Sequence, residues 1–275
     1  MTLTFLRAVG VALLVLVAAA PAAAQAPQDD PDLDINLAQP DFTLVALPTT
    51  LRLPKFKSAF RVTHRFTRPL GDGSFGDLAS DFFGLDSGAQ IGLEYRFGLM
   101  RGTQVGIHRT SDRTIQFFTQ HEVVAQGGRS PVTVSALATI DGTNNFRDSY
   151  SPALGAVVSR TLGEHGALYF EPIWVNNSNS LPSEVIDDND SVLLGLAARI
   201  RVRPTVYLTL EGVPRVAGYD PGSTQIGFGL EKRSGGHMFQ LVVSNGFGTT
   251  LGQVARGAAN NDDWYLGFSI SRKFY

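Results

Sequence analysis

The chain has 275 residues, of which 43% are hydrophobic and only 17% are charged, and its formal net charge is -2. The mean hydropathy of +0.02 is too polar for a bundle of membrane-spanning helices, while the charged fraction is low for a soluble protein. The slight excess of acidic residues argues against nucleic-acid binding, and the absence of cysteine excludes disulfides.

The first residues have the pattern of an export signal. Arg7 precedes an apolar run over residues 8–20, and the small residues that follow this run fit a signal-peptidase site. The run is shorter than the ~20 residues that a membrane-spanning helix needs. We therefore predict a signal peptide over residues 1–24, cleaved before Gln25, with an uncleaved membrane anchor as the alternative.

Residues 25–54 are predicted to form a periplasmic N-terminal lead that is partly disordered. Their first part is polar and rich in aspartate, a composition typical of disordered segments. The second part, residues 37–54, is more apolar. Two interpretations of it stay open: a short helix or strand that lies on the barrel rim or enters the barrel, and a bare linker.

From residue 55 to Tyr275, apolar and polar residues alternate in about twelve segments, each close to the ~9–11 residues of a membrane-crossing strand. In the first segment, for example, Phe60 and Val62 alternate with Arg61. Backbone amides in hydrocarbon must all be paired, so such strands persist only as a closed sheet with the apolar side chains outward. The predicted fold is all-β, a transmembrane antiparallel up-and-down β-barrel of about twelve strands over residues 55–275.

The predicted connections alternate between long and short along the chain. Bacterial outer-membrane barrels have long loops outside the cell and short turns in the periplasm. An even number of strands then leaves both termini in the periplasm, and the predicted location is the outer membrane of a Gram-negative bacterium. The glycine-rich residues 246–257 are expected to form a flexible outer loop.

Large aromatic residues fall on the lipid-facing positions at both expected membrane interfaces. Two girdles are predicted, formed by Phe66, Trp174 and Trp264 at the outer interface and by Phe60, Phe97 and Phe274 at the inner one. The expected partners are outer-membrane lipid, lipopolysaccharide and the outer-membrane assembly machinery. That machinery would recognise the last strand, in which alternate apolar residues lead to an aromatic. The oligomeric state stays open.

Several short motifs near the first strand and in the second half of the chain resemble those of one known family. They include Phe83-Gly84-Leu85-Asp86-Ser87-Gly88-Ala89, Gly218-Tyr219-Asp220-Pro221, Gly236-His237-Met238-Phe239-Gln240 and Trp264-Tyr265-Leu266-Gly267-Phe268. The family is an uncharacterised bacterial family of β-barrel proteins, catalogued as a domain of unknown function. The resemblance covers nearly the whole barrel. It implies the fold and the compartment only, because the family has no assigned activity.

A set of charged residues falls on the lumen-facing positions of the predicted strands. Its members are Arg61, Arg65, Glu94, Arg96, Glu122, Glu171, Arg199 and Glu211. A barrel of this size can fill its interior with such side chains or leave a narrow channel. The first hypothesis is therefore a narrow passive channel for small polar solutes. The alternative is a structural or partner-docking barrel that is plugged by paired charges.

The sequence carries no signature of an enzyme or of a metal site. The five histidines are scattered without a His-x-x-x-His spacing, and no Gly-x-Ser-x-Gly elbow occurs. We therefore predict no enzymatic activity, no metal and no cofactor. Some barrels of this strand number hydrolyse lipids with a serine and a histidine on the outer wall, so an envelope lipid hydrolase that uses His121 is a third hypothesis.

Overall fold

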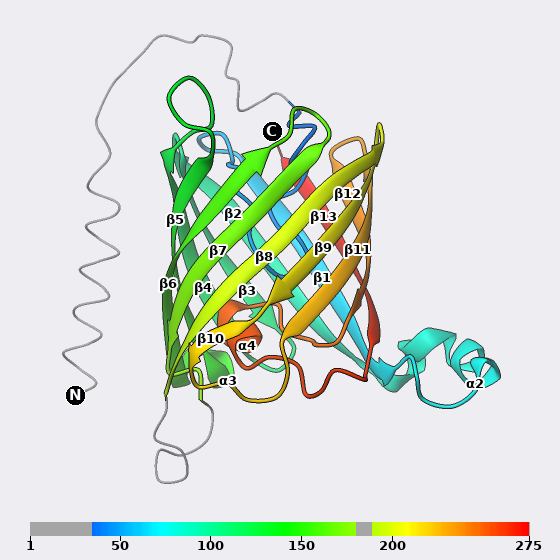
Figure 1. The fold of residues 1–275 in the computed structure, drawn as a ribbon. Coiled ribbons are helices and arrows are strands. Elements are labelled where there is room, and N and C mark those ends of the chain that lie inside the picture. Colours follow the sequence, from blue (N-terminus) through cyan, green and yellow to red (C-terminus); the bar gives the residue numbers. More distant parts are fainter. Residues whose placement is uncertain (1–34, 180–188, 275) are drawn as a thin grey trace. The chain divides into compact units, whose positions relative to one another are not determined.

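The structure is a computed structural model that describes residues 35–179 and 189–274. Over these ranges the chain forms one closed antiparallel β-barrel (Figure 1). The predicted signal peptide and the aspartate-rich start of the lead lie outside the described residues. So do residues 180–188 and Tyr275.

The wall consists of strands that follow one another in chain order. They are β1 (Ser58–Pro69), β2 (Ala89–Met100), β3 (Thr103–Thr110), β4 (Ile115–Val124), β5 (Thr133–Gly142), β6 (Asp148–Thr161), β7 (Gly166–Asn176), β8 (Asp190–Arg203), β9 (Val206–Val213), β10 (Arg215–Gly218), β11 (Gln225–Ser234), β12 (His237–Ser244) and β13 (Tyr265–Phe274). Neighbouring wall strands pair antiparallel, and β13 closes the sheet against β1. The short β10 continues β9 along β8, so the two share one wall position and the barrel has 12 strands. The predicted barrel is confirmed.

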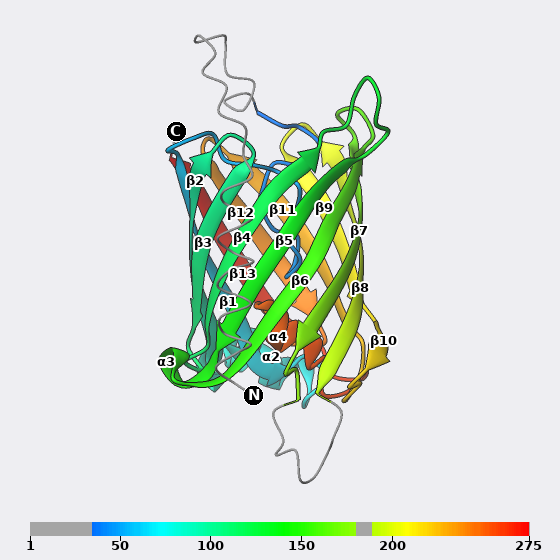
Figure 2. The same ribbon diagram turned by 90° about the vertical axis from the view of Figure 1, so that its left-hand side faces the viewer.

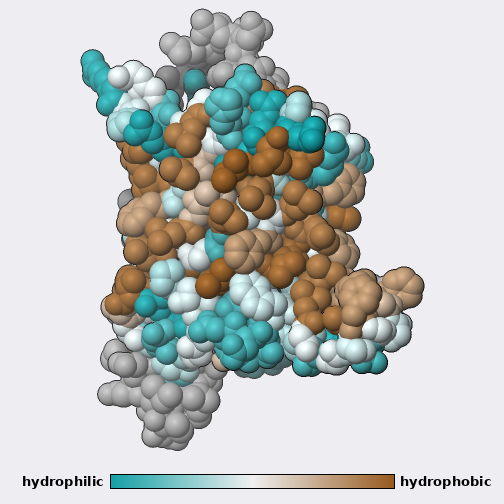
Figure 3. All heavy atoms as spheres, turned by 45° about the vertical axis from the view of Figure 1, so that its right-hand side comes forward, coloured by the Kyte–Doolittle hydropathy of each residue, from teal (hydrophilic) through white to brown (hydrophobic). Residues whose placement is uncertain are grey.

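Period-two alternation places apolar residues outside and polar residues inside. On β2, Leu93 and Tyr95 are exposed, while Glu94 between them is buried in the lumen. Figure 3 shows the result on one face of the barrel, where a band of hydrophobic residues lies between hydrophilic ends. Hydrocarbon can cover this band, because the antiparallel ladders pair the backbone amides behind it, apart from a short gap at Pro172.

The two ends of the barrel differ in their connections. At one end, which we call the turn end, lie short turns, the first described residues and the end of β13 (Figure 1). The opposite end, the loop end, carries the longer connections. The described parts of these connections contain four short helices: α2 (Phe75–Ser80), η2 (Phe82–Ser87), α3 (Thr143–Phe146) and α4 (Leu251–Ala255). No helix in the described ranges is long and apolar enough to cross a membrane.

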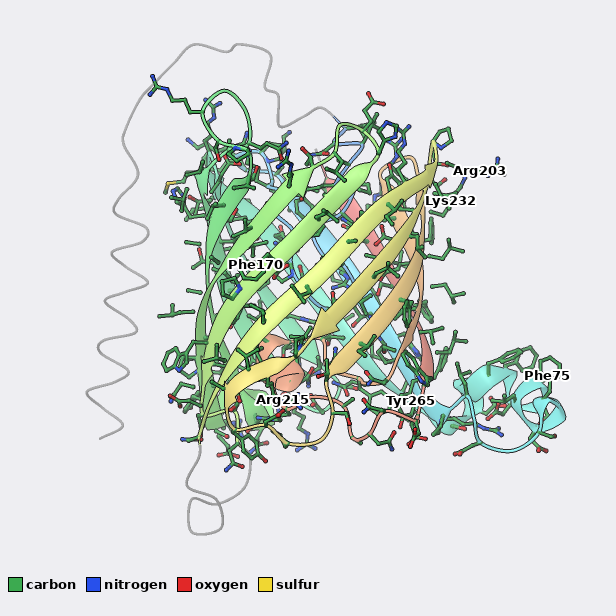
Figure 4. The ribbon with its side chains drawn as sticks, viewed as in Figure 1. Phe75, Phe170, Arg203, Arg215, Lys232 and Tyr265 are labelled. Carbon is green, nitrogen blue, oxygen red and sulfur yellow. The ribbon has the colours of Figure 1, made fainter. Side chains whose placement is uncertain are left out.

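Two of these helices lie in very different surroundings. Helix α2 projects sideways from the loop end, with the exposed Phe75 on it (Figure 4). Helix α4 instead lies in the lumen, enclosed by the barrel wall, and all five of its residues are buried (Figure 2). The expectation of a flexible outer loop over residues 246–257 is therefore wrong, because this glycine-rich connection folds back into the lumen.

The sequence also predicts a bulge or an early strand end at Pro172 in β7, because proline removes one ladder donor. The structure keeps a single register there: Gly155 pairs with Ile173 and Val158 pairs with Phe170. Only the pairs between these two positions are missing, and no extra residue is inserted. The bulge prediction is wrong, because the sheet tolerates a local gap in the β6–β7 ladder.

The lumen is filled by the chain's own residues. Residues 38–54, which we call the plug, enter from the turn end and run inside the barrel before β1 (Figure 2). Leu44 and Leu47 of the plug form one apolar cluster with Leu251 and Val254 of α4. The wall contributes Leu137, Ala153, Val157, Ala167, Tyr169, Ile173, Val175, Leu193 and Val213 to this cluster. The core of the protein therefore lies in the lumen.

Candidate functional site

The plug folds into a tight hairpin with its tip in the lumen. The Leu44 N–H donates to the Leu47 carbonyl at 2.8 Å, and the Thr49 N–H donates to the Phe42 carbonyl at 2.8 Å. Side chains of Asp41 and Thr49 bind a few more of its backbone groups, but most of the tip has no partner inside the hairpin. Buried backbone groups of this kind require partners elsewhere.

Glu211 of β9 binds the tip of the hairpin. Its carboxylate accepts the backbone N–H groups of Val45 at 3.0 Å, Ala46 at 3.0 Å and Leu47 at 2.9 Å. The side chain is only 4% exposed. Hydrogen bonds to an ionised group are roughly twice as strong as neutral ones. Glu211 is therefore the main polar anchor of the tip.

Two arginines of β1 bind the same tip from the other side of the lumen. Arg61 and Arg65 each donate a hydrogen bond of 3.1 Å to the Val45 carbonyl. Arg65 also donates to the Phe268 carbonyl of the wall at 3.2 Å. Val45 is therefore held at both its N–H and its carbonyl, by wall residues of opposite charge.

Arg199 of β8 binds the strand that leads to the tip. It donates to the carbonyls of Asp41 at 3.1 Å and Thr43 at 2.7 Å, and it forms a salt bridge of 2.9 Å with Glu231. Both charged side chains are almost completely buried. A buried ion pair is stable only when further hydrogen bonds satisfy it, and the plug carbonyls supply them here.

Uncharged side chains and rim residues hold the rest of the plug. Further contacts are Gln240 to the Leu44 carbonyl (2.9 Å), Gln120 to the Thr49 carbonyl (2.8 Å), Gln104 to the Leu51 carbonyl (3.0 Å) and the Leu53 N–H (3.1 Å), Lys273 to the Pro40 carbonyl (2.6 Å), and the Arg52–Glu122 ion pair. The polar wall thus contacts the plug along its whole length.

Wall glycines make room for the plug. A Cβ atom at Gly195 would lie 2.7 Å from Leu47 Cδ1, and one at Gly227 would lie 2.8 Å from Val45 Cγ1. A larger residue at either position would force the Leu47 or Val45 side chain to shift. Close approach of another backbone is a common reason for glycine within a strand.

The structure brings most of the eight predicted lumen residues to the plug. Seven of the eight are buried inside the barrel, and Glu122 is half-buried near the turn end. Glu94 pairs with Arg96 at 2.8 Å without contacting the plug backbone. Glu171 is fully buried, and neither of its oxygens has a hydrogen-bond partner in the described ranges. Whether these residues line a path for solutes stays a prediction.

Sequence reasoning missed the uncharged ligands of the plug. Gln104, Gln120 and Gln240 lie on lumen positions of β3, β4 and β12, as the period-two pattern would have indicated. It also missed the apolar half of the lumen, where Ala153 and Val157 of β6 face inward. The outward-facing residues that alternate with them are also apolar, so the middle of β6 is a continuous apolar sequence. An inward-facing apolar surface therefore cannot be recognised from its alternation pattern.

The connection from β12 to β13 closes the lumen from the loop end. Thr250 and Gln253 form a capping box at the start of α4. Asp141 of β5 accepts hydrogen bonds from the Thr250 hydroxyl at 2.5 Å and the Gly252 N–H at 3.0 Å. These bonds attach α4 to the inner wall.

Asp112, in the connection between β3 and β4, holds the same helix. Its carboxylate accepts a hydrogen bond of 2.8 Å from Gln253. Burial alone raises the pKa of Asp112, but hydrogen bonds from Thr110, Thr114 and Gln253 bring that pKa below its ordinary value. Asp112 is therefore a carboxylate whose ionised form favours the docked α4.

Little space remains between the plug and α4. A chamber of about 30 Å³ lies between them, bordered by Thr43 of the plug and Leu251 of α4. That volume suits two or three water molecules, at about 10–15 Å³ each. The buried plug and the buried α4 therefore occupy most of the lumen on both sides of this chamber.

The predicted girdle residues lie on the outer wall with different exposure. Phe60 and Phe274 are exposed, whereas Phe97, Trp174 and Trp264 are partly exposed. Phe66 is only 6% exposed, because the connection after β1 passes over it and its ring packs against His64 and Phe268.

The geometry around His121 does not assemble a hydrolase site. The ring is half-buried on the outer wall, and its Nδ1 lies 2.7 Å from the Thr103 hydroxyl. Within residues 35–179 and 189–274, no serine or carboxylate hydrogen-bonds to it. The same residues contain no group of three or more side chains that could hold a metal ion.

Comparisons with known proteins agree with the barrel. Residues 41–274 match the protein family described as "Membrane bound beta barrel domain (DUF5777)", and this match begins inside the plug rather than at β1. No curated protein matches the chain.

Two solved structures show the same architecture. The NanC porin aligns with a TM-score of 0.52 at 7% identity, covering 80% of this chain and 99% of the porin chain. An outer membrane channel from Pseudomonas putida F1 aligns with a TM-score of 0.50 at 12% identity, covering 81% of this chain and 97% of that chain. At these identities the likeness concerns the fold.

Proposed function

The chain belongs to the family of membrane-bound β-barrel domains, and we propose that it is an outer-membrane channel for small polar solutes, held closed by its own plug. The observation that carries this proposal is the set of charged wall residues that bind the plug backbone. Glu211, Arg65 and Arg199 bind backbone groups of the plug. If the plug moved out, water could replace the plug backbone as the hydrogen-bond partner of these three side chains. A wall of this kind can exist both with the plug docked and with a hydrated lumen.

The absence of a covalent link between plug and wall supports a movable closure. The chain has no cysteine, so the plug is attached only through its continuation into β1 and by non-covalent contacts. Burying the charged wall side chains under the plug costs desolvation free energy. Water recovers this cost when the plug leaves and the side chains become hydrated. A twelve-stranded barrel has a narrow interior, which suits small polar solutes rather than large ones.

The proposal includes the orientation and the flanking segments. With a signal peptide over residues 1–24 and a lead before the plug, the turn end would face the periplasm and the loop end the outside. Long loops at one end and short turns at the other support this orientation. Outer-membrane lipid, lipopolysaccharide and the assembly machinery would be the partners, and no catalytic role is proposed.

One observation favours the alternative, a plugged structural or partner-docking barrel. Leu44 and Leu47 share an apolar cluster with Leu251 of α4 and with the inner wall. Burying apolar area stabilises the docked plug by about 25 cal/mol per Å². Such a cluster opposes opening, so the two functions differ in whether the plug ever leaves.

Single-channel recording in planar bilayers decides between them. Purified full-length protein should give discrete but infrequent conductance steps. Arg65→Ala should make openings more frequent because it removes a plug contact, whereas Glu94→Ala should change the size of each step. Lys232 faces outward, so Lys232→Ala is the control that should change neither the frequency of openings nor the size of each step. Silent bilayers from folded protein would favour the plugged barrel.

A further inference from the structure

We propose that the chamber between the plug and α4 binds a small monovalent anion, and that Arg96, which stays on the wall when the plug leaves, makes the open channel prefer anions over cations. The inference rests on the proposed channel function and names its class of solute. It concerns a site that is enclosed on three sides by the plug, the β12–β13 connection and the wall.

The chamber is built from distant parts of the chain. The plug contributes Thr43, Ala46 and Pro48, and the β12–β13 connection contributes Thr249 and Leu251. The wall lining comes from β2 to β5 and consists of Glu94, Arg96, His108, Gln116, Phe118, Gln120, Leu137 and Thr139. The plug and the β12–β13 connection both border the chamber. A molecule bound there would therefore affect whether these two segments stay docked.

Four residues that line this chamber each have a buried polar atom without a partner in the described part of the chain. These atoms are Arg96 Nη1 and the hydroxyls of Thr43, Thr139 and Thr249. None of the four side chains is more than 5% exposed. Buried polar groups in proteins are nearly always paired, so four such residues around one chamber indicate an occupant.

The fixed charges indicate the sign of that occupant. Arg96 is held between the rings of Phe118 and Phe42, with its guanidinium carbon 4.6 and 5.2 Å from their centroids. Its Nε and Nη2 both donate to one oxygen of Glu94, at 3.1 and 2.8 Å, which leaves Nη1 for another acceptor. A guanidinium can only donate, so its partner must be an acceptor.

Two guanidinium groups share the Glu94 carboxylate. Arg61 also approaches Glu94, with 3.9 Å between Nη1 and the second carboxylate oxygen, and this Nη1 has no hydrogen-bond partner among the described residues. Glu211, the other carboxylate at the plug tip, already accepts three backbone N–H groups of the plug. A bound anion would accept charge-assisted hydrogen bonds from the spare N–H groups, and these are stronger than the bonds that water accepts.

The volume limits the anion. A chamber of about 30 Å³ holds two or three waters, so it fits chloride, nitrate or formate and excludes sugars and amino acids. Gluconate serves as the large anion that should not enter the chamber.

The first test is the reversal potential of the full-length protein in planar bilayers under a potassium chloride gradient. We expect a reversal potential on the anion-selective side, and Arg96→Gln should move it toward zero or to the cation side. Arg160→Gln is the matched control, since Arg160 is exposed on the outer wall of β6. Discrete conductance steps with no anion preference would overturn the inference and leave the channel function standing.

A second measurement does not depend on conduction. The melting temperature of the detergent-solubilised full-length protein should be several degrees higher in chloride or formate than in gluconate at equal ionic strength, because an anion that binds only the folded state stabilises it. Arg96→Gln should abolish this difference, and Thr139→Val, which keeps every charge, should reduce it. Equal melting temperatures in all three salts would refute the site. Silent bilayers would instead overturn the channel, and the melting data would then decide the anion site alone.

Discussion

Replacing Glu211 by glutamine tests whether the wall holds the plug. The carboxylate accepts three backbone N–H bonds of 2.9 to 3.0 Å at the hairpin tip. A bond to a charged group contributes about 1.5–3 kcal/mol and a neutral one about 1 kcal/mol. Glutamine keeps one neutral acceptor oxygen, so the docked plug should lose about 3 kcal/mol, which is roughly a hundredfold in the ratio of open to closed states.

The assay is the open probability of single channels, combined with protease cleavage of the plug. Glu211→Gln should raise both, while the barrel still resists unfolding in detergent. Glu171→Gln is the matched control, because it changes an equally buried carboxyl group whose oxygens accept no bond from the described residues. If the two variants opened equally often, the proposed anchoring role of Glu211 would be refuted.

Three further predictions concern stability, steric fit and pH. Arg199→Gln leaves Glu231 buried without its ionic partner and should destabilise the barrel by about 3–5 kcal/mol, measured as a lower temperature of the gel-mobility shift on heating. Gly227→Val should displace the plug at Val45 without changing any charge, and should therefore increase protease cleavage of the plug. Because the folded-state pKa of Asp112 lies below its ordinary value, its contribution to holding α4 is present at neutral pH and is lost as the pH falls below about 4. Hydrogen exchange of α4 should accelerate in that range, and Asp112→Asn should weaken this dependence without abolishing it, because the Asp141 carboxyl also binds α4.

The wall could be predicted from the sequence because lipid imposes a strict pattern. Each strand must place apolar residues outward at every second position, so the parity of Arg61 or Glu94 follows from its neighbours. The placement of the charged residues inside the barrel required no knowledge of distant contacts.

The plug and α4 could not be predicted in this way. Residues 37–54 have no periodic pattern, and their conformation depends on partners such as Glu211, which lies 164 positions from Leu47. The glycine-rich connection that contains α4 resembles a flexible loop, because its docking partner Asp141 is 111 residues away from Gly252. Local sequence cannot encode contacts of this separation, so the closed lumen became visible only in the structure.

A reversible lock on the plug tests the central claim most directly. The Thr50 hydroxyl lies 2.5 Å from the Ser159 hydroxyl of β6, and the chain has no cysteine of its own. Thr50→Cys combined with Ser159→Cys should therefore form a single disulfide between plug and wall. We expect no channel openings from the oxidised double variant and their return on reduction, whereas each single variant should open regardless of reductant. Openings of unchanged frequency in the oxidised double variant would contradict the claim that residues 38–54 close the lumen.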